Sequence, residues 1–127
     1  MSKLPKNLQL LISALIVILM AFVYGFNPSV MMPYIFGFEV QDLELKNIFR
    51  AVMGIYLAFG VYWIYGVLNL KHWKPATLVN ILFMGGLAFG RCISTILDGW
   101  SPQYGIGMLL EAIMMFWAIW NLKFYKN

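Results

Sequence analysis

Four long apolar runs dominate the pattern of hydrophobic and polar positions along the chain. They cover residues 8–26, 48–69, 75–97 and 104–122. The first run has no charged residue, and each of the others has one: Arg50, Arg91 and Glu111 in turn. A helix needs about 20 residues to cross the roughly 30 Å hydrocarbon layer of a bilayer, whereas a barrel strand needs only about 10. The pattern therefore predicts four transmembrane helices and an all-α integral membrane bundle.

Capping residues refine the ends of these helices. Ser101-Pro102 is typical of an N-cap followed by the first helical residue, and Pro75 is expected to begin a helix in the same way. Asp42 is a candidate N-cap, with Glu44 near the positive end of the helix dipole. The expected helices span about 8–26, 43–69, 75–97 and 104–122, in one domain of residues 1–127.

The longest connection, residues 27–47, is too apolar for a free loop. We expect it to lie in the membrane interface or to fold over the end of the bundle as a short helix. The apolar run before it is longer than that of a signal peptide, and no small-x-small cleavage motif follows it. We therefore expect the first run to remain as a helix.

Composition excludes an ordinary soluble domain and a disordered chain. Hydrophobic residues make up 62 % of the sequence and charged residues 11 %, against about 45–50 % and about 25 % in soluble proteins. Cys92 and His72 are the single residues of their types. Zinc and iron sites built from these ligands are thereby excluded, and we expect no metal and no cofactor.

The lysines predict the orientation in the membrane. With four helices, both termini and the link at residues 71–74 share one side. That side carries six lysines and no acidic residue: Lys3, Lys6, Lys71, Lys74, Lys123 and Lys126. The other side carries four acidic residues and one lysine: Glu39, Asp42, Glu44, Asp98 and Lys46. Because Lys and Arg collect on the cytoplasmic side, both termini are predicted to be cytoplasmic. Insertion and anionic lipid account for the net charge of +4, so we expect no nucleic-acid partner.

Two charges are predicted to meet inside the bundle. Arg91 lies roughly 9 Å, and Glu111 roughly 10 Å, from the outer ends of their helices at 1.5 Å per residue. An unpaired charge at a helix centre costs about 2.5–3.5 kcal/mol, and arginine can hold a carboxylate with two hydrogen bonds. The pair either fixes the helix register or belongs to a functional site.

Other polar residues are expected to gather near this pair in the outer half of the bundle. The candidate ligand-binding residues are Arg50, Arg91, Glu111, Asp98, Tyr56, Ser94, Asn80 and Tyr104. Some have structural alternatives. Arg50 is alternatively a snorkelling anchor at the interface, and Asp98 a loop carboxylate or a turn former with Gly99. Gly86-x-x-x-Gly90 allows a close helix approach, which we interpret as packing within the chain.

These residues resemble a known family. The runs that carry the resemblance are Arg50-Ala-Val-Met-Gly54-Ile-Tyr56, Gly90-Arg91-x-x-Ser94-x-x-x-Asp98-Gly99-x-x-Pro102, and Glu111. They are similar to the small bacterial four-helix membrane proteins of the domain-of-unknown-function 4345 family, over nearly the whole chain. The resemblance implies a multi-pass protein of the bacterial cytoplasmic (inner) membrane, and it implies no reaction.

Three functions remain open. The first is binding of an amphipathic molecule, such as a lipid, quinone or isoprenoid, between the helices. The second is a structural or accessory subunit of a larger membrane complex or homo-oligomer. The third is a proton-coupled transporter or membrane enzyme that uses Glu111. No Ser-His or Cys-His constellation supports catalysis, so the third function ranks behind the other two.

Overall fold

The computed structural model describes residues 3–125, which form five helices. They are α1 (Lys3–Gly25), α2 (Pro28–Phe36), α3 (Leu43–Leu68), α4 (Leu70–Asp98) and α5 (Pro102–Phe124). No strand occurs in this part of the chain. All the helices except α2 are long and apolar enough to cross a membrane. The prediction of an all-α chain with four such helices is confirmed.

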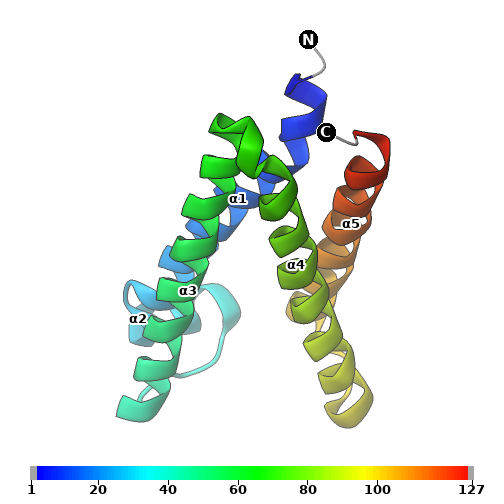
Figure 1. Cartoon of the computed structure of the whole chain (residues 1–127). Helices are drawn as coiled ribbons and strands as arrows, with labels where there is room; N and C mark the ends of the chain where they lie inside the picture. Colours follow the sequence, from blue (N-terminus) through cyan, green and yellow to red (C-terminus); the bar gives the residue numbers. More distant parts are fainter. Residues whose placement is uncertain (1–2, 126–127) are drawn as a thin grey trace.

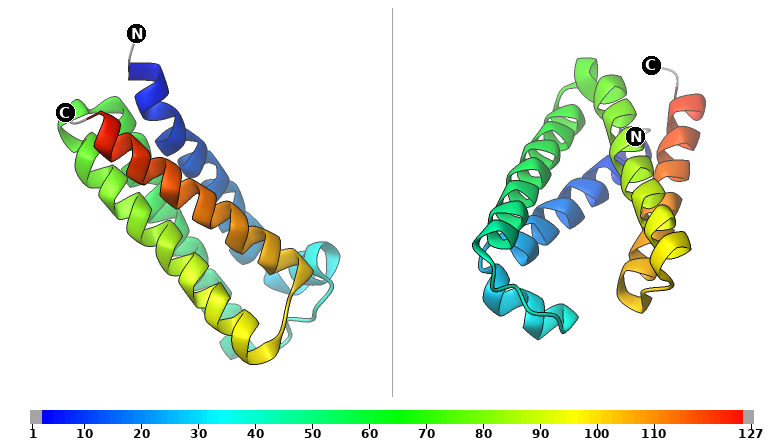
Figure 2. Two further views of the ribbon diagram at one scale, coloured as in Figure 1. Left: turned by 90° about the vertical axis from the view of Figure 1, so that its right-hand side faces the viewer. Right: turned by 90° about the horizontal axis from the view of Figure 1, so that it is seen from below.

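The long helices form two pairs that meet at one end and diverge towards the other. Helix α1 packs mainly on α3, and α4 packs mainly on α5. The pairs meet where α3 turns into α4, and α2 lies beside the diverging halves of α1 and α3 (Figure 1). The start of α1 and the end of α5 lie at the end where the pairs meet (Figures 1 and 2).

A stripe of small and medium apolar side chains joins α1 to α3. The buried residues of α1 recur every three or four positions: Leu10, Ala14, Val17, Ala21 and Tyr24. This spacing puts them on one helix face. Opposite them, a Cβ atom at Gly60 would lie 2.6 Å from Ile18 Cγ1. The missing side chain at Gly60 therefore lets the two backbones approach closely.

The predicted start of α4 at Pro75 is wrong. The helix begins at Leu70, and the side chain of its N-cap, Asn69, accepts a 3.2 Å hydrogen bond from the Lys71 backbone N–H. Asn69 also ends α3, so a single residue joins two long helices. Pro75 lies inside α4, where it removes one backbone hydrogen bond near the helix end.

Helix α2 accounts for the apolar connection. It begins with Pro28 after Asn27 and ends at Phe36, and its C-cap Gly37 has a left-handed φ of 80°. The Gly37 N–H bonds to the carbonyls of Met32 and Pro33. A glycine is favoured there because it has no Cβ to strain the turn. The expected short helix therefore forms, and it covers one end of the cavity described below.

Candidate ligand-binding site

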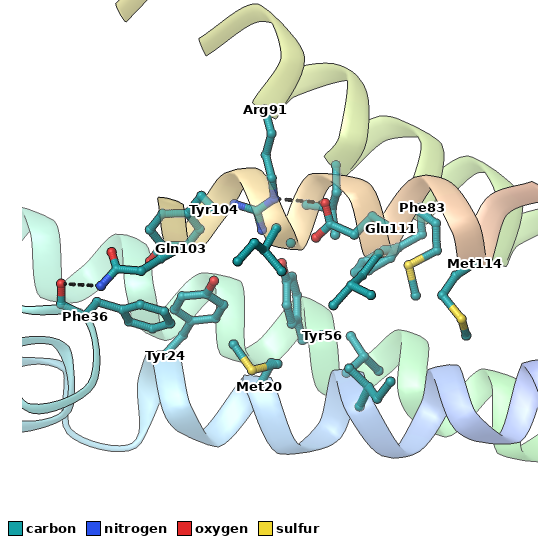
Figure 3. A pocket seen from close by; sticks show the side chains of 17 residues that line it. Met20, Tyr24, Phe36, Tyr56, Phe83, Arg91, Gln103, Tyr104, Glu111 and Met114 are labelled. Atoms are coloured by element: carbon teal, nitrogen blue, oxygen red, sulfur yellow. Dashed lines mark hydrogen bonds and ion pairs between the residues drawn. The ribbon is translucent and has the colours of Figure 1, made fainter. Parts of the chain in front are cut away.

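A cavity of about 290 Å³ lies between the two helix pairs, in their diverging half. All five helices contribute to its wall (Figure 3). The lining includes Met20, Tyr24, Phe36, Tyr56, Phe83, Arg91, Gln103, Tyr104, Glu111 and Met114. Most of this wall is aliphatic or aromatic, and the charged groups lie together at one place.

The charged groups are the predicted pair. Arg91 Nε donates a 2.9 Å hydrogen bond to Glu111 Oε1, joining α4 to α5. The two side chains are 21 % and 15 % exposed. Because the bond leaves from Nε, the terminal amino groups of the guanidinium lie beside it on the cavity side (Figure 3). They are the strongest hydrogen-bond donors in the cavity wall.

Tyrosines surround this pair. The Arg91 guanidinium lies 5.0 Å from the centre of the Tyr104 ring, within the range of a cation–π contact. Tyr24 and Tyr56 point their hydroxyls towards Arg91 (Figure 3), and their rings meet edge to face at 5.9 Å. The polar part of the cavity wall thus combines the Arg91 cation, the Glu111 anion and phenolic hydroxyl groups.

Half of the predicted site residues line this cavity, namely Tyr56, Arg91, Tyr104 and Glu111. Ser94 lines a second cavity of about 270 Å³, together with Thr95, Ser101, Arg91 and Tyr104. Arg91 and Tyr104 therefore separate the two cavities. The second cavity lies beside the turn from α4 to α5 and is rimmed by hydroxyl groups.

Arg50 and Asp98 do not gather with Arg91. The Arg50 Nε donates a 2.6 Å hydrogen bond to the Gly25 carbonyl, and Nη2 donates a 3.5 Å bond to the Phe26 carbonyl. Asp98 is exposed at the end of α4. The prediction that Arg50 and Asp98 gather with Arg91 and Glu111 is therefore wrong. Depth along a helix does not determine which neighbour a side chain faces.

Asn80 is buried, but it belongs to a different polar contact. Its Oδ1 accepts a 2.9 Å hydrogen bond from Gln9 Nε2, which also bonds to the Met114 carbonyl at 3.0 Å and to Ser13 Oγ at 3.2 Å. This contact joins α1 to α4 and α5. Asn80 therefore bonds across helices and lines neither cavity, and its partner Gln9 was not predicted from the sequence.

The described residues contain no group of three or more His, Cys, Asp or Glu side chains that could hold a metal ion.

A family model matches residues 6–122. The chain belongs to the family described as domain of unknown function (DUF4345). No curated protein and no solved structure is similar enough to count as a match.

The DUF4345 match includes every residue that lines the two cavities. It confirms the family resemblance of the Arg91 and Glu111 region, and it assigns no role to a residue. The other cavity residues, among them Tyr24, Phe36 and Gln103, were not predicted as site residues from the sequence. The spacing of residues on α1 could have indicated Tyr24, because Tyr24 is the last member of the buried stripe on that helix.

Proposed function

We propose that the protein is a multi-pass protein of the bacterial inner membrane with both termini in the cytoplasm. Large apolar side chains are exposed on every long helix, for example Leu19, Val61, Leu82 and Phe116. An outward apolar surface on each helix suits lipid and not water. A soluble four-helix bundle would instead cover these faces with charged residues.

The charge distribution supports this orientation. Lys6, Lys71, Lys74 and Lys123 belong to the ends of α1, α4 and α5 that meet at one end of the molecule (Figure 1). Lys126 and the side chain of Lys3 lie outside the described residues. The acidic Glu39, Asp42, Glu44 and Asp98 belong to the segments at the other end. Because lysines collect on the cytoplasmic side of membrane proteins, this charge distribution favours a cytoplasmic location for the lysine-rich end.

We further propose that the cavity between the helix pairs binds an amphipathic molecule, such as a lipid, quinone or isoprenoid. One observation carries this proposal: among the described residues that line this apolar cavity, Arg91 and Glu111 are the charged ones, and they are in contact. Ligand sites are mostly apolar, with a few convergent polar groups that orient the ligand. The apolar wall would hold a chain, and the Arg91 cluster would hold the head.

Native mass spectrometry of the protein released gently from its membrane tests this function. We expect the wild type to carry a small molecule and Arg91→Gln to lose it. Arg50→Gln is the matched control, because it makes the same change outside the cavity. A wild type without a bound molecule, or an Arg91→Gln variant that retains it fully, would overturn the proposal.

A second candidate function is an accessory subunit of a larger complex, with Arg91–Glu111 as a structural ion pair. The observation that favours it is the outward position of Gly86 and Gly90, where an added Cβ would meet nothing within 4 Å. Small-xxx-small faces allow close helix contacts in membranes. A heavier assembly without a small molecule in the same spectrum would favour this function.

A further inference from the structure

The cavity opens sideways, between α1 and α5. Three of its lining residues have exposed side chains at this gap: Ile16 on α1 at 48 %, and Ile106 and Leu110 on α5 at 57 % each. The lining residues of α3 and α4 are all buried or half-buried: Tyr56, Phe83, Met84, Leu87 and Arg91. Gln103 of α5 is also exposed, but its side chain bonds to the Phe36 carbonyl at the α2 end. The rest of the rim is aliphatic.

In contrast, contacts of α2 close the end of the cavity that this helix covers. Phe36 of α2 stacks on Tyr104 with ring centres 5.1 Å apart. Gln103 Nε2 donates a 3.1 Å hydrogen bond to the Phe36 carbonyl. Tyr24 also stacks on Phe36, with ring centres 6.0 Å apart. With α2 in place, the exposed apolar lining residues lie between α1 and α5, which makes this gap the route for an apolar chain into the cavity.

The volume limits how much of a ligand fits inside. Pockets that enclose a drug-sized ligand measure about 300–1,000 Å³, and this cavity measures about 290 Å³. It holds a polar head and the first part of a chain. The rest of a lipid chain would have to leave through the aliphatic gap, where a membrane-spanning bundle would meet acyl chains.

The polar part of the cavity wall has no net formal charge. Arg91 and Glu111 are in contact at 2.9 Å, and among the described lining residues Arg91 is the only cation. A phosphate or carboxylate bound there would also face the Glu111 carboxylate, and like charges in a poorly solvated site repel strongly. A neutral carbonyl or hydroxyl oxygen accepts from Arg91 and the tyrosines without that repulsion. A hydroxyl can also donate to Glu111.

We propose that the site takes a neutral membrane lipid. Its hydroxyl or carbonyl head lies against Arg91 and Glu111, and its chain leaves between α1 and α5 into the bilayer. This inference rests on the proposed ligand-binding function and specifies both the ligand class and the route of entry. The class comprises long-chain alcohols, quinones and isoprenoid alcohols, which share an uncharged oxygen and an apolar chain.

Photoaffinity labelling in phosphatidylcholine nanodiscs tests the inference. The probes share one alkyl chain, just long enough to reach the gap between α1 and α5, with a diazirine at its far end. They differ only in the head: an alcohol, a carboxylate or a phosphate monoester. We expect the alcohol to label α1 and α5 around Ile16, Ile106 and Leu110. We expect the two anionic probes to label these positions about tenfold less, which corresponds to about 1.4 kcal/mol.

Two tryptophan variants test the route. Ile106→Trp narrows the opening and should lower labelling by the alcohol about fivefold through overpacking. Ile113→Trp is the matched control, because Ile113 is equally exposed on α5, at 59 %, and does not line the cavity. It should leave labelling unchanged.

The outcomes separate this inference from the proposed function. Equal labelling by the phosphate probe overturns the neutral head. Unchanged labelling in Ile106→Trp, or a chain end that labels α2, overturns the lateral route, while Arg91-dependent binding of the alcohol would still support a ligand site. If no probe labels a cavity residue, and the wild type also carries no molecule from its membrane, the proposed function itself fails.

Discussion

Two arginines inside apolar runs have different partners. Arg91 is held by the Glu111 carboxylate at 2.9 Å. Arg50 instead donates to the carbonyls of Gly25 and Phe26 at the end of α1. The last carbonyls of a helix have no partner within it, and a cation is favoured near the negative end of the helix dipole. Arg50 therefore caps α1, whereas Arg91 lines the cavity.

Replacing the ion pair should show strong coupling between its members. We expect Arg91→Met or Glu111→Met alone to lower the free energy of unfolding by about 1–3 kcal/mol, because each leaves a half-buried charge without its partner. The double variant should lie close to the wild type, since apolar side chains replace both charges. Denaturant titration in detergent micelles measures all four proteins. Additive losses in the double variant would contradict a direct coupling.

At the scale of elements, glycines separate tightly packed helices from open faces. Gly60 of α3 faces Ile18 and Val17 of α1, where a Cβ would lie 2.6 Å and 3.0 Å from their γ-carbons. Gly86 and Gly90 of α4 have open space around them. The interpretation of Gly86-x-x-x-Gly90 as packing within the chain is wrong. The spacing of small residues shows that helices can approach closely, but the partner is decided by rotation of the helix.

The same substitution at two glycines should have opposite effects. We expect Gly60→Ala to lower the free energy of unfolding by about 1–3 kcal/mol, because the stiff β-branched side chains of α1 must move. Gly86→Ala should be neutral or stabilising by up to about 1 kcal/mol, since alanine favours a helix over glycine. Thermal unfolding followed by tryptophan fluorescence compares the two. A loss at Gly86 as large as that at Gly60 would show a contact there.

At the scale of the whole molecule, a polar contact joins the two helix pairs towards the end where they meet. Gln9 of α1 bonds to Asn80 of α4 and to the Met114 carbonyl of α5. Trp73 of α4 adds a 3.3 Å hydrogen bond from Nε1 to the Lys6 carbonyl of α1. Buried hydrogen bonds are directional, so they hold the pairs in one relative position. The diverging half, which contains the cavity, depends on this anchor.

Removing the anchor should destabilise the arrangement of the pairs. We expect Gln9→Leu to lower the free energy of unfolding by about 1–3 kcal/mol, because the buried Asn80 loses its partner. Gln9→Leu combined with Asn80→Leu should recover most of that loss, since both polar partners are gone. Chemical denaturation measures the three variants. A double variant that is less stable than Gln9→Leu would contradict this account.

The orientation of the whole molecule is also testable. We expect green fluorescent protein fused after residue 127 to fluoresce, and alkaline phosphatase inserted in the turn around Gly99 to be active, because the first folds in the cytoplasm and the second outside it. Both assays use intact cells. The reverse pair of results would place the lysine-rich end outside, against the rule that lysines remain in the cytoplasm.

The sequence by itself determined the number of long helices and the pairing of Arg91 with Glu111. A run of apolar residues has a length that relates directly to helix length, and the 1.5 Å rise per residue gives the depth of a side chain along its helix. Both are local quantities. The start of α4 was misplaced for a local reason as well, because Asn69 provides an earlier N-cap than Pro75.

Only the tertiary structure decided which helices pair and which side chains share the cavity. The positions of Arg50, Asp98, Gly86 and Asn80 depend on how far each helix is rotated about its axis. That rotation is set by packing between residues far apart in the chain, such as Gly60 against Ile18 and Gln9 against Asn80. Depth follows from the sequence of one helix, whereas the facing partner follows from the packing of all of them.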